Sequence, residues 1–261
     1  MTDPATGTPA PPPPSPWERE RPARAQGAPA RLPLSRDRVV DAAFTVLDRA
    51  GLDGLSMRQV AAELGVSASA LYAYVSSKDD LLELMYARLF DGFAIPRPDP
   101  DRWQEQVRDY ARSARQRLLA HRDMARLSMA HAPFTAELLP HVEAVLAVFR
   151  AAGLPDHVAA RAGDIISTYI DGFVLEESMW RDRRAGHGSG DPAPALPDPG
   201  EMAGEMQTYF ASLPAADFPH LRALSGLLVT DSSEERFDVG LEIILRGLAS
   251  YLPDRMGSQD S

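Results

Sequence analysis

The side chains of this chain that are capable of chemistry favour recognition over catalysis. The 261-residue sequence has no cysteine, and its six histidines do not pair with acidic residues at metal-ligand spacing along one helix. It has no Gly-x-Ser-x-Gly motif, no phosphate-binding loop and no His-Glu-x-x-His motif. Asp171 and Glu176 are five residues apart and are not expected to share a helix face. We therefore expect no enzymatic activity, no cofactor and no bound metal.

Several serines precede predicted helices, whose N-terminal N–H groups can bind phosphate. Ser35, Ser56, Ser67 and Ser77 each precede a segment with helical apolar periodicity, as N-cap residues do. A helix N-terminus presents backbone N–H groups that suit phosphate oxygens. The predicted helices begin at Ser35 and end at Ala50-Gly51, then span Met57–Leu64, Ala68–Val75 and Ser77–Asp91.

Two of these short helices are joined by a tight turn, Glu63-Leu64-Gly65-Val66, with a further helix behind them. This is the geometry of a helix-turn-helix. The second helix of such a pair enters a DNA major groove.

The sequence of this segment resembles that of the DNA-binding domain of the tetracycline-repressor (TetR) family. The residues that carry the resemblance are LSMRQVAAELGVS from Leu55 to Ser67, then Ala70-Leu71-Tyr72-Ala73-Tyr74-Val75, Lys78 and Leu81-Leu82. The alternative is a chance helix-turn-helix pattern.

The resemblance implies which residues touch DNA. Arg58 would reach a guanine edge, because its fork of donors meets two acceptors. Ala68 and Ala70 would offer only apolar contact, so the operator should differ from those read by family members with glutamine or threonine there. Leu71 and Val75 are expected in the core. Tyr74 and Lys78 would contact phosphates. The full predicted contact set is Arg58, Ser67, Ala68, Ser69, Ala70, Tyr72, Tyr74 and Lys78.

The resemblance extends beyond the first domain, to the C-terminal domain of the tetracycline repressors. It is carried by Trp103, LLAHRD at 118–123, GFVLE at 172–176 and GLEIILRGL at 240–248, and so covers roughly 34–252. The implied fold is all-α. It comprises a DNA-binding domain over 34–92 and a helical ligand-binding and dimerisation domain over 97–253, with tails at 1–33 and 254–261.

Apolar periodicity predicts the remaining helices, and no alternating strand pattern is present. The last two strong helices carry surplus apolar surface, and Gly172, Gly240 and Gly247 would allow close backbone approach. We expect them to form a four-helix bundle with a second copy, the alternative being an intrachain core alone. The predicted ranges are Trp103–His121, Met124–Met129, Thr135 or Pro140 to Phe149, Pro155–Trp180, Glu201–Ser212, His220–Val229 and a final helix capped by Ser233 and running to Leu252.

A ligand pocket is implied by the same resemblance. The position of the family's magnesium-ligating histidine is Ser128, the drug-anchoring asparagine corresponds to Tyr110, and a pocket phenylalanine to Ala114. Only Glu176 remains of the metal-linked set, and a serine hydroxyl is a poor Mg²⁺ ligand. We therefore expect a ligand other than tetracycline–magnesium. His131 and Thr168 are further candidates for polar lining.

Composition sets outer bounds on these expectations. The net charge of −10 argues against nonspecific coating of nucleic acid, and residues 31–95 hold seven basic and nine acidic side chains. Lys78 is the only lysine. No run of eighteen apolar residues or signal peptide is seen, so we expect a cytoplasmic protein without a membrane partner.

Residues 1–33 hold ten of the 23 prolines and are expected to be disordered or polyproline-like, as a solvated tail or a DNA-touching arm.

Together these features predict a homodimeric transcriptional regulator that binds double-stranded operator DNA. We expect a ligand-responsive repressor, released by a small-molecule effector. One alternative is a repressor without a small-molecule inducer. Another is a helical ligand-binding or scaffold protein whose DNA-binding domain is vestigial.

Overall fold

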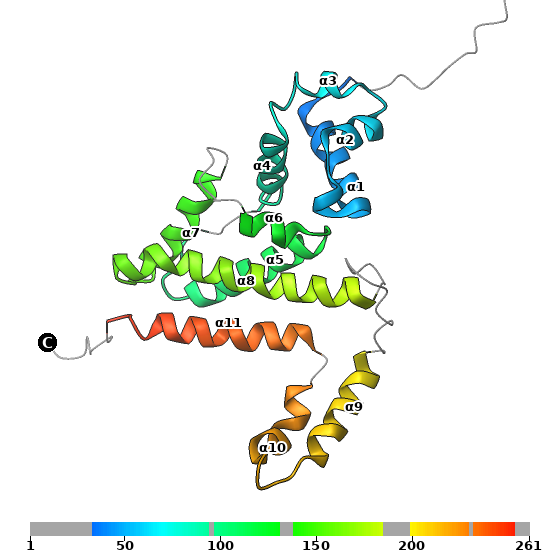
Figure 1. Ribbon diagram of the computed structural model, residues 1–261. Helices are drawn as coiled ribbons and strands as arrows, with labels where there is room; N and C mark the ends of the chain where they lie inside the picture. The colour runs from blue at the N-terminus through cyan, green and yellow to red at the C-terminus, as the bar shows by residue number, and fades with distance from the viewer. Residues whose placement is uncertain (1–32, 94–96, 131–137, 185–198, 230–231, 254–261) are drawn as a thin grey trace, which may run out of the picture. The chain divides into compact units, whose positions relative to one another are not determined.

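The computed structural model describes residues 33–93, 97–130, 138–184, 199–229 and 232–253. The chain divides into two compact units, Met1–Leu34 and Ser35–Ser261. Within the described ranges all regular structure is α-helical, which confirms the predicted fold class (Figure 1). The predicted tails, except for Pro33, lie outside the described residues. The helices are α1 (Arg36–Gly54), α2 (Met57–Leu64), α3 (Ala68–Leu71), α4 (Lys78–Arg88), α5 (Trp103–Leu119), α6 (Met124–Ala130), α7 (Leu139–Ala151), α8 (Asp156–Arg184), α9 (Pro199–Ser212), α10 (Pro219–Leu228) and α11 (Ser233–Ala249).

Three of the predicted serine caps are confirmed by hydrogen bonds. The Ser35 hydroxyl accepts from the Arg38 N–H at 3.3 Å, that of Ser56 from Gln59 at 3.4 Å, and that of Ser77 from Asp80 at 3.0 Å. Each bond satisfies one of the N–H groups that a helix leaves unpaired in its first turn.

Three helix boundaries in the N-terminal segment differ from those predicted. The chain leaves helical geometry at Gly51, as predicted, with φ 70° and ψ 176°, but α1 continues beyond this kink to Gly54. Helix α4 ends at Arg88 and not at Asp91. Helix α3 ends at Leu71, whose carbonyl accepts from both Tyr74 and Val75 in a closing turn.

One predicted cap lacks its hydrogen bond and another lies at the wrong residue. Ser67 is the N-cap residue of α3, as predicted, but its hydroxyl makes no capping hydrogen bond and lies 2.9 Å from the Ser69 hydroxyl. The cap of α11 is Ser232, which accepts from the Glu235 N–H, while Ser233 donates to the Glu177 carboxylate.

Hydrogen bonds join the second half of α1 to the junction between α5 and α6. Asp48 accepts from the Arg122 N–H and pairs with His121, each at 3.0 Å. The Asp123 carboxylate accepts from the Leu52 N–H at 2.8 Å, just after the Gly51 kink. These bonds tie the helix-turn-helix segment to the larger helical body at a point far along the sequence.

Helix α8 is the centre of that body, because α5, α6, α7 and α11 all pack against it (Figure 1). Its contact with α11 depends on Tyr169, whose ring stacks on Phe237 at 5.3 Å and whose hydroxyl donates to the Phe237 carbonyl at 2.8 Å. A Cβ built on Gly240 would clash with the Tyr169 ring. In the single chain, the close neighbour that Gly240 admits is the Tyr169 ring.

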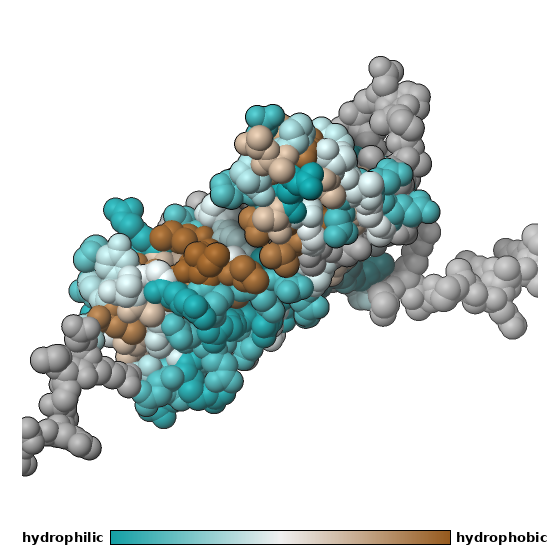
Figure 2. Space-filling view, turned by 90° about the horizontal axis from the view of Figure 1, so that it is seen from below, coloured by the Kyte–Doolittle hydropathy of each residue, from teal (hydrophilic) through white to brown (hydrophobic). Residues whose placement is uncertain are grey.

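Helices α9 and α10 pack chiefly against each other. No helix in the described ranges is long and apolar enough to span a membrane. The face seen from below carries apolar patches (Figure 2). The large exposed apolar side chains of the described residues include Leu227 on α10 and Val239 and Ile243 on α11.

Candidate functional site

The segment predicted to read DNA presents an outward face. Gly65 closes α2 in the left-handed conformation, with φ 65° and ψ 35°, and so allows the sharp turn into α3. Leu71 and Val75 are buried, as predicted, and anchor the segment from below. The side chains of Tyr72 and Tyr74 are 54% and 37% exposed. Of the predicted contact set, Arg58, Ser67, Ser69, Tyr72, Tyr74 and Lys78 are exposed, and Ala68 and Ala70 are half-buried.

Polar groups on this face suit a DNA backbone and base edges. Arg58 on α2 and Lys78 at the start of α4 are both exposed cations. The hydroxyls of Ser67 and Ser69 and the exposed tyrosines add hydrogen-bonding groups of the kind that contact phosphates. The geometry leaves the predicted contact residues accessible to a groove.

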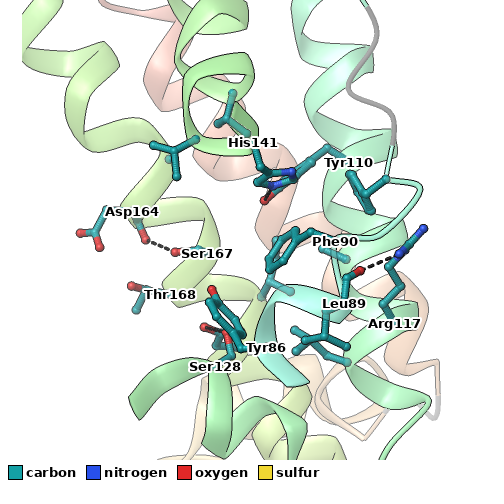
Figure 3. A pocket seen from close by; sticks show the side chains of 18 of the residues that line it. Tyr86, Leu89, Phe90, Tyr110, Arg117, Ser128, His141, Asp164, Ser167 and Thr168 are labelled. Carbon is teal, nitrogen blue, oxygen red and sulfur yellow. Dashed lines mark hydrogen bonds between the residues drawn. The ribbon is translucent and has the colours of Figure 1, made fainter. Parts of the chain in front are cut away.

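A cavity of about 410 Å³ lies among α4, α5, α6, α7 and α8 (Figure 3). Four predicted ligand residues line it, namely Tyr110, Ala114, Ser128 and Thr168. A fifth, His131, lies outside the described residues.

The structure does not bring Glu176 to this cavity. Its carboxylate pairs with Arg236 on α11 at 2.8 Å, and both side chains are about half exposed. The neighbouring Glu177 accepts two hydrogen bonds from the Arg115 guanidinium, at 2.9 and 2.5 Å. Both acidic groups hold helices together, on the side of α8 that faces α11 and α5.

Aromatic rings form one wall of the cavity. Phe90 packs on His141 with ring centroids 4.3 Å apart and on Tyr86 at 5.4 Å (Figure 3). Phe93 contacts Tyr110 edge-on at 5.2 Å, and the Tyr110 hydroxyl lies 3.1 Å from His141 Nε2. Burial, and then the positive charge of Arg117, lower the pKa of His141 to about 4, so this imidazole is neutral at physiological pH.

The cavity lining also includes a buried carboxyl group. Asp171 on α8 is only 8% exposed, and its Oδ2 accepts from the Ser128 hydroxyl at 3.0 Å. Burial raises the pKa of Asp171 to about 6, against the opposing effect of the Ser128 hydrogen bond. Tyr86 lies close to this pair, and burial raises the pKa of its phenol.

Asp171 and Arg117 are cavity residues that sequence reasoning missed. A signal for Asp171 was present, because this acid interrupts the apolar stripe of α8 between Ile170 and Val174. Arg117 had no such signal. Its Nη1 donates to the carbonyls of Leu89 at 2.6 Å and Asp91 at 2.9 Å, and its guanidinium lies 4.8 Å from the centre of the Phe93 ring.

No group of three or more histidine, aspartate and glutamate side chains within the described ranges is arranged to hold a metal ion. The cavity therefore offers hydrogen bonds, ring faces and one buried carboxyl group to a ligand.

Family profiles match almost the whole of the helical chain. Residues 39–85 match the profile of bacterial regulatory proteins of the tetR family, and residues 95–252 that of the tetracyclin repressor-like C-terminal domain. The chain belongs to the TetR family of transcriptional regulators, which bind DNA through a helix-turn-helix, and its C-terminal domain is of the tetracycline-repressor type.

Individual relatives agree with this assignment. An HTH-type transcriptional regulator of Saccharopolyspora erythraea is 30% identical over 83% of this chain and 85% of its own length. The class A tetracycline repressor protein from transposon 1721 of Escherichia coli is 33% identical over 83% of this chain and 91% of its own. The crystal structure of the Streptomyces coelicolor TetR family protein ActR in complex with actinorhodin superposes with a TM-score of 0.73 at 37% identity, covering 85% of this chain and 98% of that one.

Proposed function

We propose that this protein is a homodimeric, ligand-responsive transcriptional repressor, and not an enzyme. The observation that carries the proposal is that one helix, α4, joins the two candidate sites. It begins at exposed Lys78, beside the recognition segment, and its last turn and C-cap supply Tyr86 and Leu89 to the cavity. We place the DNA-binding domain at 34–92 and the ligand-binding and dimerisation domain at 97–253.

Dimerisation would place two recognition helices in successive major grooves, about one helical turn of DNA apart. Exposed apolar residues support α8 and α11 as the interface, since Ile165 is 46% and Ile243 is 67% exposed. Gly172 and Gly247 face open space in the single chain, so a second copy could approach there closely. An exposed apolar patch of this kind is typical of a protein–protein contact.

The effector we propose is an aromatic small molecule other than tetracycline–magnesium. Ser128 stands at the position of the family's metal-ligating histidine, and the cavity presents Phe90, Tyr110 and His141 as ring surfaces. The relative ActR was crystallised with actinorhodin, which supports a small-molecule ligand for a cavity of this type.

Ligand binding would act by shifting α4 and so the spacing of the recognition helices. Moving the population from 1:99 to 99:1 takes about 5.5 kcal/mol of differential affinity between the two states. A single hydrogen bond contributes about 0.5–1.5 kcal/mol, so several contacts would have to change together.

Gel-shift titration against the protein's own promoter region tests the DNA-binding half of the proposal. We expect specific retardation that survives competition by unrelated DNA, because base contacts add to the backbone contacts. Absence of binding at low salt, where electrostatic affinity is greatest, would refute it. The alternative of a vestigial DNA-binding domain predicts that combined alanine substitution of Arg58, Tyr72 and Lys78 leaves expression of the neighbouring genes unchanged.

A further inference from the structure

The cavity holds one buried acidic side chain without a charged partner. The Asp171 side chain is only 8% exposed, and its single described hydrogen bond comes from the neutral Ser128 hydroxyl. No lysine, arginine or histidine of the described residues forms an ion pair with it. A buried carboxylate normally requires a cation or several donors, because loss of hydration is costly.

The cation that also lines the cavity is already occupied. Arg117 donates to two carbonyl oxygens at the end of α4, Leu89 at 2.6 Å and Asp91 at 2.9 Å. Its flat guanidinium also rests on the Phe93 ring, 4.8 Å from the ring centre. A ligand anion would have to compete with these contacts, whereas a ligand cation meets a carboxyl oxygen that has room for further donors.

The aromatic wall adds to the same preference. Tyr86, Phe90 and Tyr110 present ring faces or edges to the cavity, and ring faces attract cations as well as flat apolar surfaces. Asp164, the other acid of the lining, is exposed on α8 and so remains hydrated.

We infer that the cavity selects planar aromatic ligands that carry a positively charged nitrogen, with Asp171 as the residue that determines this specificity. The nitrogen donates to the Asp171 carboxylate beside Ser128, while the rings lie against Phe90 and Tyr110. This inference rests on the proposed function, in which the cavity receives the effector.

Three tricyclic probes of matched shape test the charge preference on the full chain without DNA. They are 9-aminoacridine, a cation at neutral pH, acridine, which is neutral, and anthracene-9-carboxylate, an anion. Fluorescence titration should give the tightest binding for 9-aminoacridine. Asp171→Asn should weaken that binding by about 10- to 100-fold, the range expected for a hydrogen bond to a charged group, and leave acridine binding within about twofold.

The matched control is Glu143→Gln, which removes an exposed carboxylate of α7 outside the cavity lining and should change 9-aminoacridine binding by less than about threefold. Asp171→Leu serves as a second neutral variant, with circular dichroism confirming that each variant folds. Equal binding of 9-aminoacridine and acridine, with no effect of either Asp171 variant, would overturn the inference and leave the ligand-binding function standing. Preferred binding of the anion would overturn it in favour of Arg117. Failure of all three probes to bind would count against the ligand cavity itself.

The pH dependence gives a readout that needs no variant. The charged or titratable groups that face this region are Tyr86 and Tyr110, which stay neutral, His141, which titrates near pH 4, and Asp164 and Arg117. Affinity for 9-aminoacridine should therefore fall as pH drops from neutral through about 6, where Asp171 takes up a proton. Unchanged affinity across this range would contradict the inference.

Discussion

Arg117 on α5 donates a hydrogen bond of 2.6 Å to the carbonyl oxygen of Leu89, the C-cap residue of α4. The last carbonyls of a helix have no partner within the helix, and a cation there also complements the helix dipole. Because Arg117 lines the cavity, the end of α4 is held by a side chain that a ligand can touch.

Replacing Arg117 by methionine should loosen the end of α4. The variant keeps the length of the side chain but loses two hydrogen bonds to backbone carbonyls, so we expect the free energy of unfolding to fall by about 1.5–3 kcal/mol. Equilibrium urea denaturation measures this. Arg150→Met is the control, since Arg150 pairs with Asp156 at an exposed site and its loss should cost less than about 1 kcal/mol.

Asp171→Asn should stabilise the ligand-free protein at pH 7. The folded state raises the pKa of this carboxyl to about 6, so the unfolded chain releases the proton at lower pH than the folded chain does. Stability is therefore lost as pH rises through the window between the ordinary aspartate value and 6, and the penalty is complete above 6. We expect a gain of about 1–3 kcal/mol, or several degrees in Tm, at pH 7.

At about pH 4 the gain from Asp171→Asn should disappear, because the carboxyl is then neutral in the folded state. Thermal unfolding at both pH values measures the difference. A variant that is equally or less stable than the wild type at pH 7 would show that the carboxylate is compensated in the folded protein.

Alanine substitutions of Arg58 and of Lys78 should weaken DNA binding in different ways. Loss of Arg58 is expected to cost about 1–3 kcal/mol of operator affinity and to relax the preference for one base pair. Loss of Lys78 should weaken specific and nonspecific DNA alike and reduce the slope of affinity against salt by about one. Titrations at several salt concentrations separate the two, and a base preference lost with Lys78 would reverse the assignment.

Gly240→Ala should destabilise the contact between α8 and α11. The new Cβ would lie 2.9 Å from Tyr169 Cζ, and this ring is fixed by its stack on Phe237 and its hydrogen bond to the Phe237 carbonyl. Overpacking of this kind costs about 1–3 kcal/mol and exceeds the roughly 1 kcal/mol that alanine gains in a helix. Gly204→Ala in α9, with nothing within 4 Å, should give only the gain. Urea denaturation of the two variants should therefore move in opposite directions.

The N-terminal segment was predictable because its determinants are local. Ser56, Gly65 and Ser77 act on residues within four positions of themselves, so their spacing in the sequence is enough to locate α2 and α4. Helix α3 was predicted too long, since its end depends on a turn closed at the Leu71 carbonyl. Family position correctly led to Tyr110 and Ser128 as cavity lining.

The missed residues act over long range. Arg117 meets Leu89 across 28 positions, and Ser128 meets Asp171 across 43, so no local pattern records either contact. The same holds for Glu177, whose partner Arg115 lies 62 positions away. Apolar periodicity predicts that these residues lie in helices, but it does not predict the tertiary contacts that define their roles.

The bonds from Asp48 and Asp123 across the α5–α6 junction bear on how the chain can be dissected. A fragment ending near residue 93 would retain every residue of the recognition segment, yet it would leave Asp48 without the Arg122 N–H and the Leu52 N–H without its acceptor. In such a fragment the second half of α1 would lose these hydrogen bonds and unfold more easily. A minimal DNA-binding fragment of this protein therefore has to include residues 97–130.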